Sequence, residues 1–153
     1  MIEKGKIIQL AEEKLDEGQF LVEVSISASN VIQVVIDGMN GVTINKCVEV
    51  SRNIEHNLDR ETEDFELQVM SAGLGQPFKV YLQYVKNENR EVEVATSEGV
   101  RHSGIMMNVN DLGFDLQVTK KEKGKEEKHK QLVTRILHFN FEEIKEAKNI
   151  IKF

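Results

Sequence analysis

The sequence predicts an α+β fold divided into two domains, residues 1–77 and 78–153. In the first half, two segments with the three- and four-residue spacing of amphipathic helices alternate with segments whose apolar residues recur at every second position. The second half contains five short segments with the two-residue spacing of strands, separated mainly by Gly, Asn and charged residues. The only proline, Pro77, lies between the halves. We therefore expect the domains to join within residues 73–78.

The first domain opens with a predicted helix over residues 3–17 and a β-hairpin. Gly18 follows the helix and is a typical helix stop. Residues 20–26 alternate apolar and polar side chains, and residues 31–37 form a second β-branched run after a short turn, which together indicate a hairpin. The apolar face of the helix comprises Ile7, Ile8, Ala11 and Leu15.

A second helix is predicted from the N-cap residue Thr43 to about Asp59. Residues 65–69 then alternate as a third strand. The order is αββαβ, a KH-like arrangement in which two helices can cover one face of a three-stranded sheet. The expected inward stripe of the second helix consists of Ile44, Cys47, Val48, Ser51, Ile54 and Leu58.

Residues 38–41, Gly-Met-Asn-Gly, match the GxxG loop with which KH domains hold a nucleic-acid backbone. That loop should join two helices among cations. Here it joins a strand to a helix and follows Asp37, whose carboxylate repels phosphate. We interpret the segment as a β-to-α turn.

The second domain is predicted to be a five-stranded antiparallel barrel, because closure removes exposed edge strands. Residues 141–148 are expected to end the domain as a short helical turn. The strand segments are residues 80–84, 92–94, 105–109, 114–118 and 133–139.

Charge is distributed unevenly along the chain. The formal net charge is −6, with a balance of −8 over residues 1–78 and +2 over residues 79–153. An acidic chain is atypical of a general nucleic-acid binder. No apolar run approaches the ~20 residues that cross a bilayer, and Cys47 is the single cysteine, which is typical of a reducing compartment. We expect a cytoplasmic protein without membrane contact.

The sequence contains no group of residues with the spacing of a known catalytic site. The four histidines show no HxxxH, HxH or Cys-His spacing, so neither a metal site nor another cofactor is expected. Cys47 and Ser51 fall on the predicted inward stripe, without a nucleophile elbow. The phosphate-loop pattern is absent as well. We expect a non-enzymatic protein without a small-molecule substrate.

Residues 34–59, "VVIDGMNGVTINKCVEVSRNIEHNLD", combine a strand, a Gly-containing turn and a helix in a pattern that resembles the ribosome maturation factor RimP family. Residues 68–78, "QVMSAGLGQPF", resemble its junction motif, although Ala72, Gly75 and Gln76 replace the usual proline, acid and arginine. Residues 139–148, "FNFEEIKEAK", are similar to its closing signature.

The resemblance implies an SH3/Sm-like second domain and a protein that binds the small ribosomal subunit (30S) or its proteins and promotes assembly. The implied partners are a small-subunit ribosomal protein and nearby rRNA, and we expect a monomer. The segment 73–78 is either a plain hinge or part of the docking surface, and the run 120–130, with six Lys against three Glu, is either solvated or in contact with rRNA. The candidate partner-binding residues are Gly73, Leu74, Gln76, Pro77, Phe78, Arg101, His102, Lys120, Lys121 and Lys123.

A rival hypothesis from a different class is an Sm-like RNA-binding regulator that acts as an oligomeric ring. It predicts a ring-forming oligomer and salt-sensitive RNA binding by the purified protein. A third hypothesis, an enzyme, has no nucleophile, general base or cofactor loop to support it.

Overall fold

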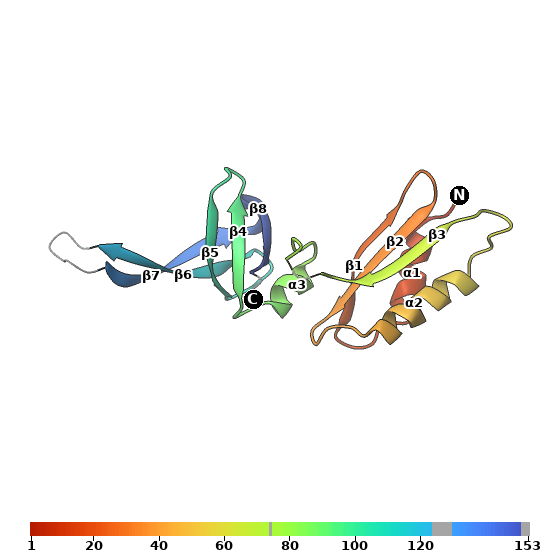
Figure 1. Cartoon of the computed structure of the whole chain (residues 1–153), viewed down its shortest axis with the longest axis horizontal. Helices are drawn as coiled ribbons and strands as arrows, with labels where there is room; N and C mark the ends of the chain where they lie inside the picture. The colour runs from red at the N-terminus through yellow and green to blue at the C-terminus, as the bar shows by residue number, and fades with distance from the viewer. Residues whose placement is uncertain (74, 124–129, 151–153) are drawn as a thin grey trace. The chain divides into compact units, whose positions relative to one another are not determined.

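The computed structural model describes residues 1–73, 75–123 and 130–150, with side chains omitted for 121–123 and 130–131 (Figure 1). The chain divides into two compact units, Met1–Gly73 and Leu74–Phe153. We call them unit 1 and unit 2. The division falls inside the segment 73–78 where the sequence places the junction. In the described part, no helix is both long and apolar enough to cross a membrane.

Unit 1 has the predicted order αββαβ. Strand β1 is antiparallel to β2, as expected of a hairpin, and β3 lies parallel to β2, so the central strand is β2. The parallel pairing follows from the connection through α2, because a crossover helix returns the chain to the same end of the sheet. The elements are α1 (Lys4–Glu12), β1 (Gln19–Ile26), β2 (Val31–Gly38), α2 (Ile44–His56) and β3 (Glu66–Ser71).

Both helices of unit 1 pack on the same face of the sheet (Figure 1). The alternation predicted for β1 is observed, with Phe20, Val22 and Val24 buried. Helix α1 ends at Glu12, earlier than predicted, while Leu15 still packs against the core from the following turn. The fully buried core of this unit comprises Ile7, Ala11, Ile32, Val34, Ile36, Val50 and Ile54.

The predicted inward stripe of α2 is wrong in part. Ile44 is 82% exposed and Val48 is also exposed, whereas Val50 and Lys46 are buried. The buried face is centred on Val50 and Ile54, so the helix is rotated relative to the predicted stripe. Lys46 fits this face because its ammonium reaches three oxygens, the Lys14 carbonyl at 2.8 Å and carboxylates of Glu49 and Asp16 at 3.0 and 3.1 Å.

Unit 2 contains a short helix and a five-stranded antiparallel sheet with the strand order β7-β6-β5-β4-β8 (Figure 1). All four neighbouring pairs are antiparallel, as predicted. The elements are α3 (Tyr81–Lys86), β4 (Glu91–Thr96), β5 (Arg101–Met107), β6 (Gly113–Lys123), β7 (Lys130–Asn140), η1 (Phe141–Glu143) and β8 (Ile144–Asn149).

Two predictions for unit 2 are wrong in secondary structure. Residues 81–84 form the start of α3 and not a strand, and Val80 is the N-cap of that helix. The side-chain oxygen of Gln83 accepts hydrogen bonds from the backbone N–H groups of Lys79 and Val80, which caps this helix. At the other end, residues 141–143 form one turn of 3-10 helix, and the rest of the predicted helical turn is strand β8. The sheet still has the predicted number of five strands, because β8 is a strand that was not predicted and residues 80–84 are not one.

The sheet of unit 2 is strongly curled. In a flat sheet of this order, β7 and β8 would lie four strand spacings apart, about 19 Å. Asn140 ends β7 and Ile144 begins β8, and the four Cα steps between them span at most about 15 Å. The sheet must therefore curl to bring these two strands together. A Cβ on Gly113 would meet the Phe139 carbonyl oxygen, so β6 and β7 approach too closely there for any other residue. The core of unit 2 comprises Phe78, Tyr84, Val92, Val94, Met106, Phe114, Leu116, Val118, Phe139 and Ala147.

Candidate functional site

The junction residues differ in their exposure. Gly75 has a φ of +80°, a conformation that favours glycine, and the following Gln76 is exposed. Phe78 is only 9% exposed and belongs to the core of unit 2. Its N–H donates to the Ala147 carbonyl at 2.8 Å and its ring packs edge-to-face on Tyr84 at 5.0 Å. Phe78 therefore anchors the segment to unit 2 and leaves Gln76 as its accessible polar side chain.

Gly73, Leu74 and Pro77 are the other junction residues predicted to contact a partner. Gly73 is exposed at the end of unit 1, and Pro77 is half-buried. Leu74 lies outside the described residues.

Arg101 and His102 lie at the start of strand β5, and their side chains face opposite ways. Successive residues of a strand project from opposite faces of the sheet. The guanidinium of Arg101 contacts the carboxylate of Glu93 and lies 3.7 Å from that of Glu146. His102 instead faces the side of the core, where its ring lies 5.6 Å from that of Phe139. The two residues thus belong to different surfaces.

A small groove in unit 2 brings His102 together with Lys120, another predicted residue. Its volume is about 200 Å³. Strand β7 adds Arg135, a basic residue that the sequence did not single out. Lys121 and Lys123 lie in β6, but their side chains are outside the described part. We name this site the hairpin groove; it is lined by His102, Val118, Lys120, Val133, Arg135 and Leu137.

The opposite face of the β6–β7 hairpin carries exposed apolar side chains. Leu132 is 70% exposed and Ile136 is 55% exposed, both in the terminal strand β7. Ile105 is also exposed, and it pairs with Gln117, which pairs with Ile136 on the next strand. We call Ile105, Leu132 and Ile136 the outer patch. Exposed apolar side chains in a row beside an edge strand are typical of a surface that binds another chain.

The loop between α2 and β3 concentrates acidic residues on unit 1. Arg60 pairs with the carboxylates of Glu55 at 2.8 Å and Asp64 at 3.1 Å, and its guanidinium lies 4.0 Å from the centroid of the Phe65 ring. Hydrogen bonds from the Thr62 hydroxyl and the Glu61 N–H hold the pKa of Asp59 below its usual value. The loop is therefore shaped by these contacts and stays negatively charged at neutral pH.

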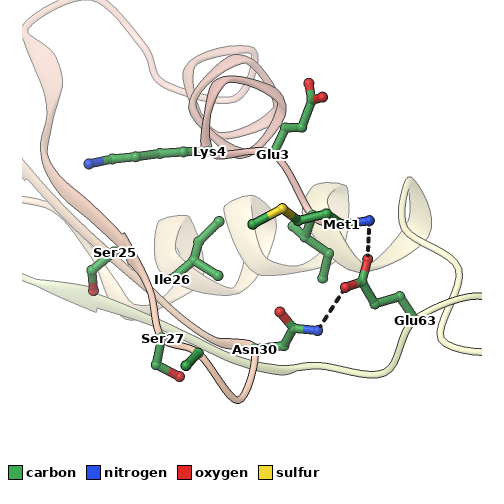
Figure 2. A pocket seen from close by; sticks show the side chains of 10 residues that line it. Met1, Glu3, Lys4, Ser25, Ile26, Ser27, Asn30 and Glu63 are labelled. Carbon is green, nitrogen blue, oxygen red and sulfur yellow. Dashed lines mark hydrogen bonds and ion pairs between the residues drawn. The ribbon is translucent and has the colours of Figure 1, made fainter.

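A broad hollow of about 830 Å³ lies beside the N-terminus of unit 1 (Figure 2). The Met1 ammonium lies 2.9 Å from Glu63, and the side-chain amide of Asn30 donates to the same carboxylate at 3.1 Å. These contacts lower the pKa of Glu63, the ammonium first and the amide second. Glu63 thus connects Met1 to Asn30 in the turn between β1 and β2.

The sequence of this chain is similar to known proteins over almost its whole length. The RimP N-terminal domain model matches residues 10–75. The ribosome maturation factor RimP of Porphyromonas gingivalis is 36% identical over 152 residues, which cover 99% of this chain and 100% of the relative. The chain belongs to the ribosome maturation factor RimP family. The RimP of Flavobacterium psychrophilum is 36% identical over 152 residues, covering 98% of each chain. That of Christiangramia forsetii is 47% identical over 95 residues, covering 61% of this chain and 62% of the relative.

Membership of the RimP family supports a role in ribosome maturation. The N-terminal domain model covers much of unit 1, whereas the hairpin groove and the outer patch lie in the part matched by the full-length relatives. Burial raises the pKa of the Cys47 thiol, which disfavours the nucleophilic thiolate. Among the described residues, no three His, Cys, Asp or Glu side chains are grouped to hold a metal ion.

Proposed function

We propose that this protein is a non-enzymatic ribosome maturation factor that acts in the cytoplasm, where it binds the small ribosomal subunit (30S) precursor or one of its proteins and promotes assembly. The observation that carries this proposal is the similarity to RimP proteins over almost the whole chain. Family members are named for maturation, and the choice of the small subunit rests on the resemblance described above.

Charge supports a basic protein partner for unit 1. Its acidic α2–β3 loop and its balance of −8 create a negative field. Ribosomal proteins are rich in Lys and Arg, so this field would steer their encounter with unit 1 and raise the association rate. Such steering weakens with salt, because the Debye length is ~8 Å at physiological ionic strength.

We further propose that unit 2 is an SH3/Sm-like barrel that contributes specific contacts. The curled sheet and the core shared by all five strands support closure of this kind. The outer patch beside β7 would bind an extended segment of the partner by strand addition. Gly73, Leu74, Gln76 and Pro77 would contribute junction contacts, with Gln76 as the most accessible described side chain.

The test is the profile of ribosomal subunits in a strain that lacks the protein. We expect small-subunit precursors to accumulate and a plasmid-borne copy to restore the normal profile. A variant with Leu132→Ser and Ile136→Ser should restore less, while the matched variant Ile44→Ser/Val48→Ser, altered at exposed apolar residues of unit 1, should restore fully. A normal profile in the deletion strain would overturn the proposal.

One observation favours the alternative, an Sm-like RNA-binding ring. Strand β7 is at the edge of its sheet and carries exposed Leu132 and Ile136, so a second copy could pair with it. The molar mass of the purified protein, measured by sedimentation, distinguishes the two proposed functions. A monomer near 17.5 kDa is expected under the leading proposal, and a higher-order closed oligomer under the alternative.

A further inference from the structure

Strand β3 forms one edge of the unit 1 sheet, and among the described residues no strand pairs with its outer side (Figure 1). The Glu66 N–H donates at 3.0 Å to the carbonyl of Asn30, the residue before β2. Glu66 therefore directs its backbone groups toward β2, and in a parallel ladder the residues bonded to one neighbour alternate with those that face away. Leu67, Val69 and Ser71 thus direct their N–H and C=O groups to the open edge.

The two edges of this sheet are protected unequally. The pairing of β1 with β2 has an irregularity between Leu21 and Glu23, and bulges of this kind hinder pairing with another chain. Strand β3 pairs with β2 in unbroken register from Glu66 to Ser71. Its sequence, Glu-Leu-Gln-Val-Met-Ser, contains neither lysine nor proline, the residues that commonly block an edge strand. The β3 edge is therefore open to the addition of a strand.

The two faces of an added strand would contact different side chains. Leu67 and Val69 point to the helix side, where they pack, partly buried, against the core. Glu66, Gln68 and Met70 point to the face without helices, and of these Glu66 and Met70 are exposed. Apolar residues of the added strand would cover Leu67 and Val69, and its polar residues would lie beside Glu66 and Gln68. The edge thus suits a segment that alternates apolar and polar residues.

The charge beside this edge is negative. Residues 57–73 contain five carboxylates against a single cation, Arg60. The guanidinium of Arg60 is bonded to Glu55 and Asp64, and Glu63 pairs with the Met1 ammonium. In the part of the chain that the structure describes, the three other carboxylates have no cationic partner, so charge complementarity favours basic residues in the added strand. These three are Asp59, Glu61 and Glu66.

We propose that β3 pairs with an extended segment of a protein partner in which Lys or Arg alternates with apolar residues. The basic side chains lie beside Glu66 and the acidic α2–β3 loop, and the apolar ones cover Leu67 and Val69. The inference deepens the proposed function and rests on it for the source of the segment, a Lys- and Arg-rich ribosomal protein. It adds a second contact surface to the outer patch, which belongs to unit 2.

The test titrates the isotope-labelled full-length protein with a heptapeptide of alternating lysine and valine, blocked at both ends, and follows the backbone amides by nuclear magnetic resonance. The protein carries Leu132→Ser and Ile136→Ser, which removes the outer patch as a competing site. The amide signals of Leu67, Val69 and Ser71 should shift and their hydrogen exchange should slow. The dissociation constant should rise several-fold between ~50 and ~200 mM salt, because screening weakens the charge contacts.

Methylation of peptide nitrogens separates strand pairing from charge attraction. In an added strand the N–H groups of alternate residues point to β3, so they belong either to the lysines or to the valines. Methylating the nitrogens of that set should weaken binding at least about tenfold, because it removes the donors that pair with β3. Methylating the other set should largely retain binding, although both peptides carry the same charge. A peptide of alternating glutamate and valine should not bind.

Two charge variants of the protein test the acidic side of the edge. Glu61→Gln/Glu66→Gln should raise the dissociation constant about fivefold, since it removes two exposed charges. The matched control Glu12→Gln/Glu17→Gln removes the same formal charge from exposed positions elsewhere in unit 1, and it should stay within about twofold of the parent protein. Circular dichroism should give both variants the melting midpoint of that parent.

Four outcomes would overturn the inference. They are unchanged β3 amide signals at ~1 mM peptide, signal changes confined to unit 2, equal binding of the two methylated peptides, and equal effects of the two charge variants. Each would leave the subunit-profile test of the proposed function untouched. Conversely, a normal subunit profile in the deletion strain would overturn the ribosomal source of the segment while strand addition at β3 stands.

Discussion

The Nδ1 atom of His138 on β7 lies 2.7 Å from Oδ1 of Asp115 on β6. The two residues stand directly opposite each other in the antiparallel register, on the face that also bears the outer patch. The hydrogen bond with Asp115 raises the pKa of His138, and the same bond lowers the pKa of Asp115. The side-chain amide of Asn108 donates to the other oxygen of Asp115 at 2.9 Å and lowers that pKa further.

This pair predicts a pH dependence of the stability of unit 2. Because the pKa of His138 is raised, its contribution is complete below the unfolded value of 6.5 and is lost as pH rises through the folded pKa. Because the pKa of Asp115 is lowered, its contribution is complete above 3.8 and is lost as pH falls through the folded pKa. Both contributions are therefore complete between pH 3.8 and pH 6.5.

We expect the urea midpoint of unit 2 to fall between about pH 6 and pH 9 by more in the unaltered protein than in His138→Gln. The effect should be small, because His138 is mostly exposed to water. A nuclear magnetic resonance titration of the His138 ring checks the direction of its pKa. The same pH dependence in both proteins would show that the pair does not contribute.

Removing buried side-chain volume from α2 should destabilise unit 1. Ile54 is fully buried, so Ile54→Ala should lower the free energy of unfolding by about 2–5 kcal/mol. The matched control is Ile44→Ala in the same helix, which should change it by less than ~0.5 kcal/mol because Ile44 is exposed. Denaturant titration followed by circular dichroism measures both. Equal losses would mean that the burial of α2 differs from that described.

The spacing of apolar residues located α2 correctly and oriented it only approximately. The predicted stripe runs from Ile44 through Cys47 and Ser51 to Ile54 at three- and four-residue spacing, but the sheet contacts a neighbouring face centred on Val50 and Ile54. The sequence also gives no reason to bury Lys46. Its place inside depends on oxygens of Lys14 and Asp16, which only the folded chain brings near.

The spacing of apolar residues did not distinguish helix from strand at either end of unit 2. Residues 80–84 alternate like a strand, yet Tyr84 and Gln83 are buried as neighbours on a helix, and the Gln83 side chain caps that helix. Residues 144–149 have few β-branched side chains, and pairing with β4 makes them a strand. In both places tertiary contacts override a weak local preference.

The candidate groove was predictable only in part. The sequence drew attention to His102 and Lys120 because both are basic residue types in the second half. It could not separate His102 from Arg101, since that requires the face of β5 that each occupies. Arg135 was missed because only the register of β6 with β7 places it beside Val118, next to Lys120.

The cap of α2 should contribute measurably to unit 1. The Thr43 side-chain oxygen accepts a hydrogen bond from the Lys46 N–H at 3.1 Å, as the sequence predicted. Thr43→Ala should lower the free energy of unfolding by about 1 kcal/mol, because it leaves that N–H without its partner. Thr43→Ser keeps the hydroxyl and should stay close to the unaltered protein. Equal denaturation midpoints for the Ala and Ser variants would argue against the cap.

Ionisation of the Tyr84 hydroxyl should lower the stability of unit 2 at alkaline pH. Its ring packs against Phe78, Phe141 and Phe114, and burial raises the pKa of Tyr84 to about 12. Because this pKa is raised, stability is complete below the unfolded value of 10.0 and is lost as pH rises from there through about 12. A rapid pH jump, with phenolate absorbance read before unfolding, should show a phase with a midpoint near 12. Tyr84→Phe should remove this phase and the alkaline loss of stability, because it keeps the ring contacts without the hydroxyl. Tyr81→Phe should retain both, and a phase that survives in Tyr84→Phe would assign it to another group.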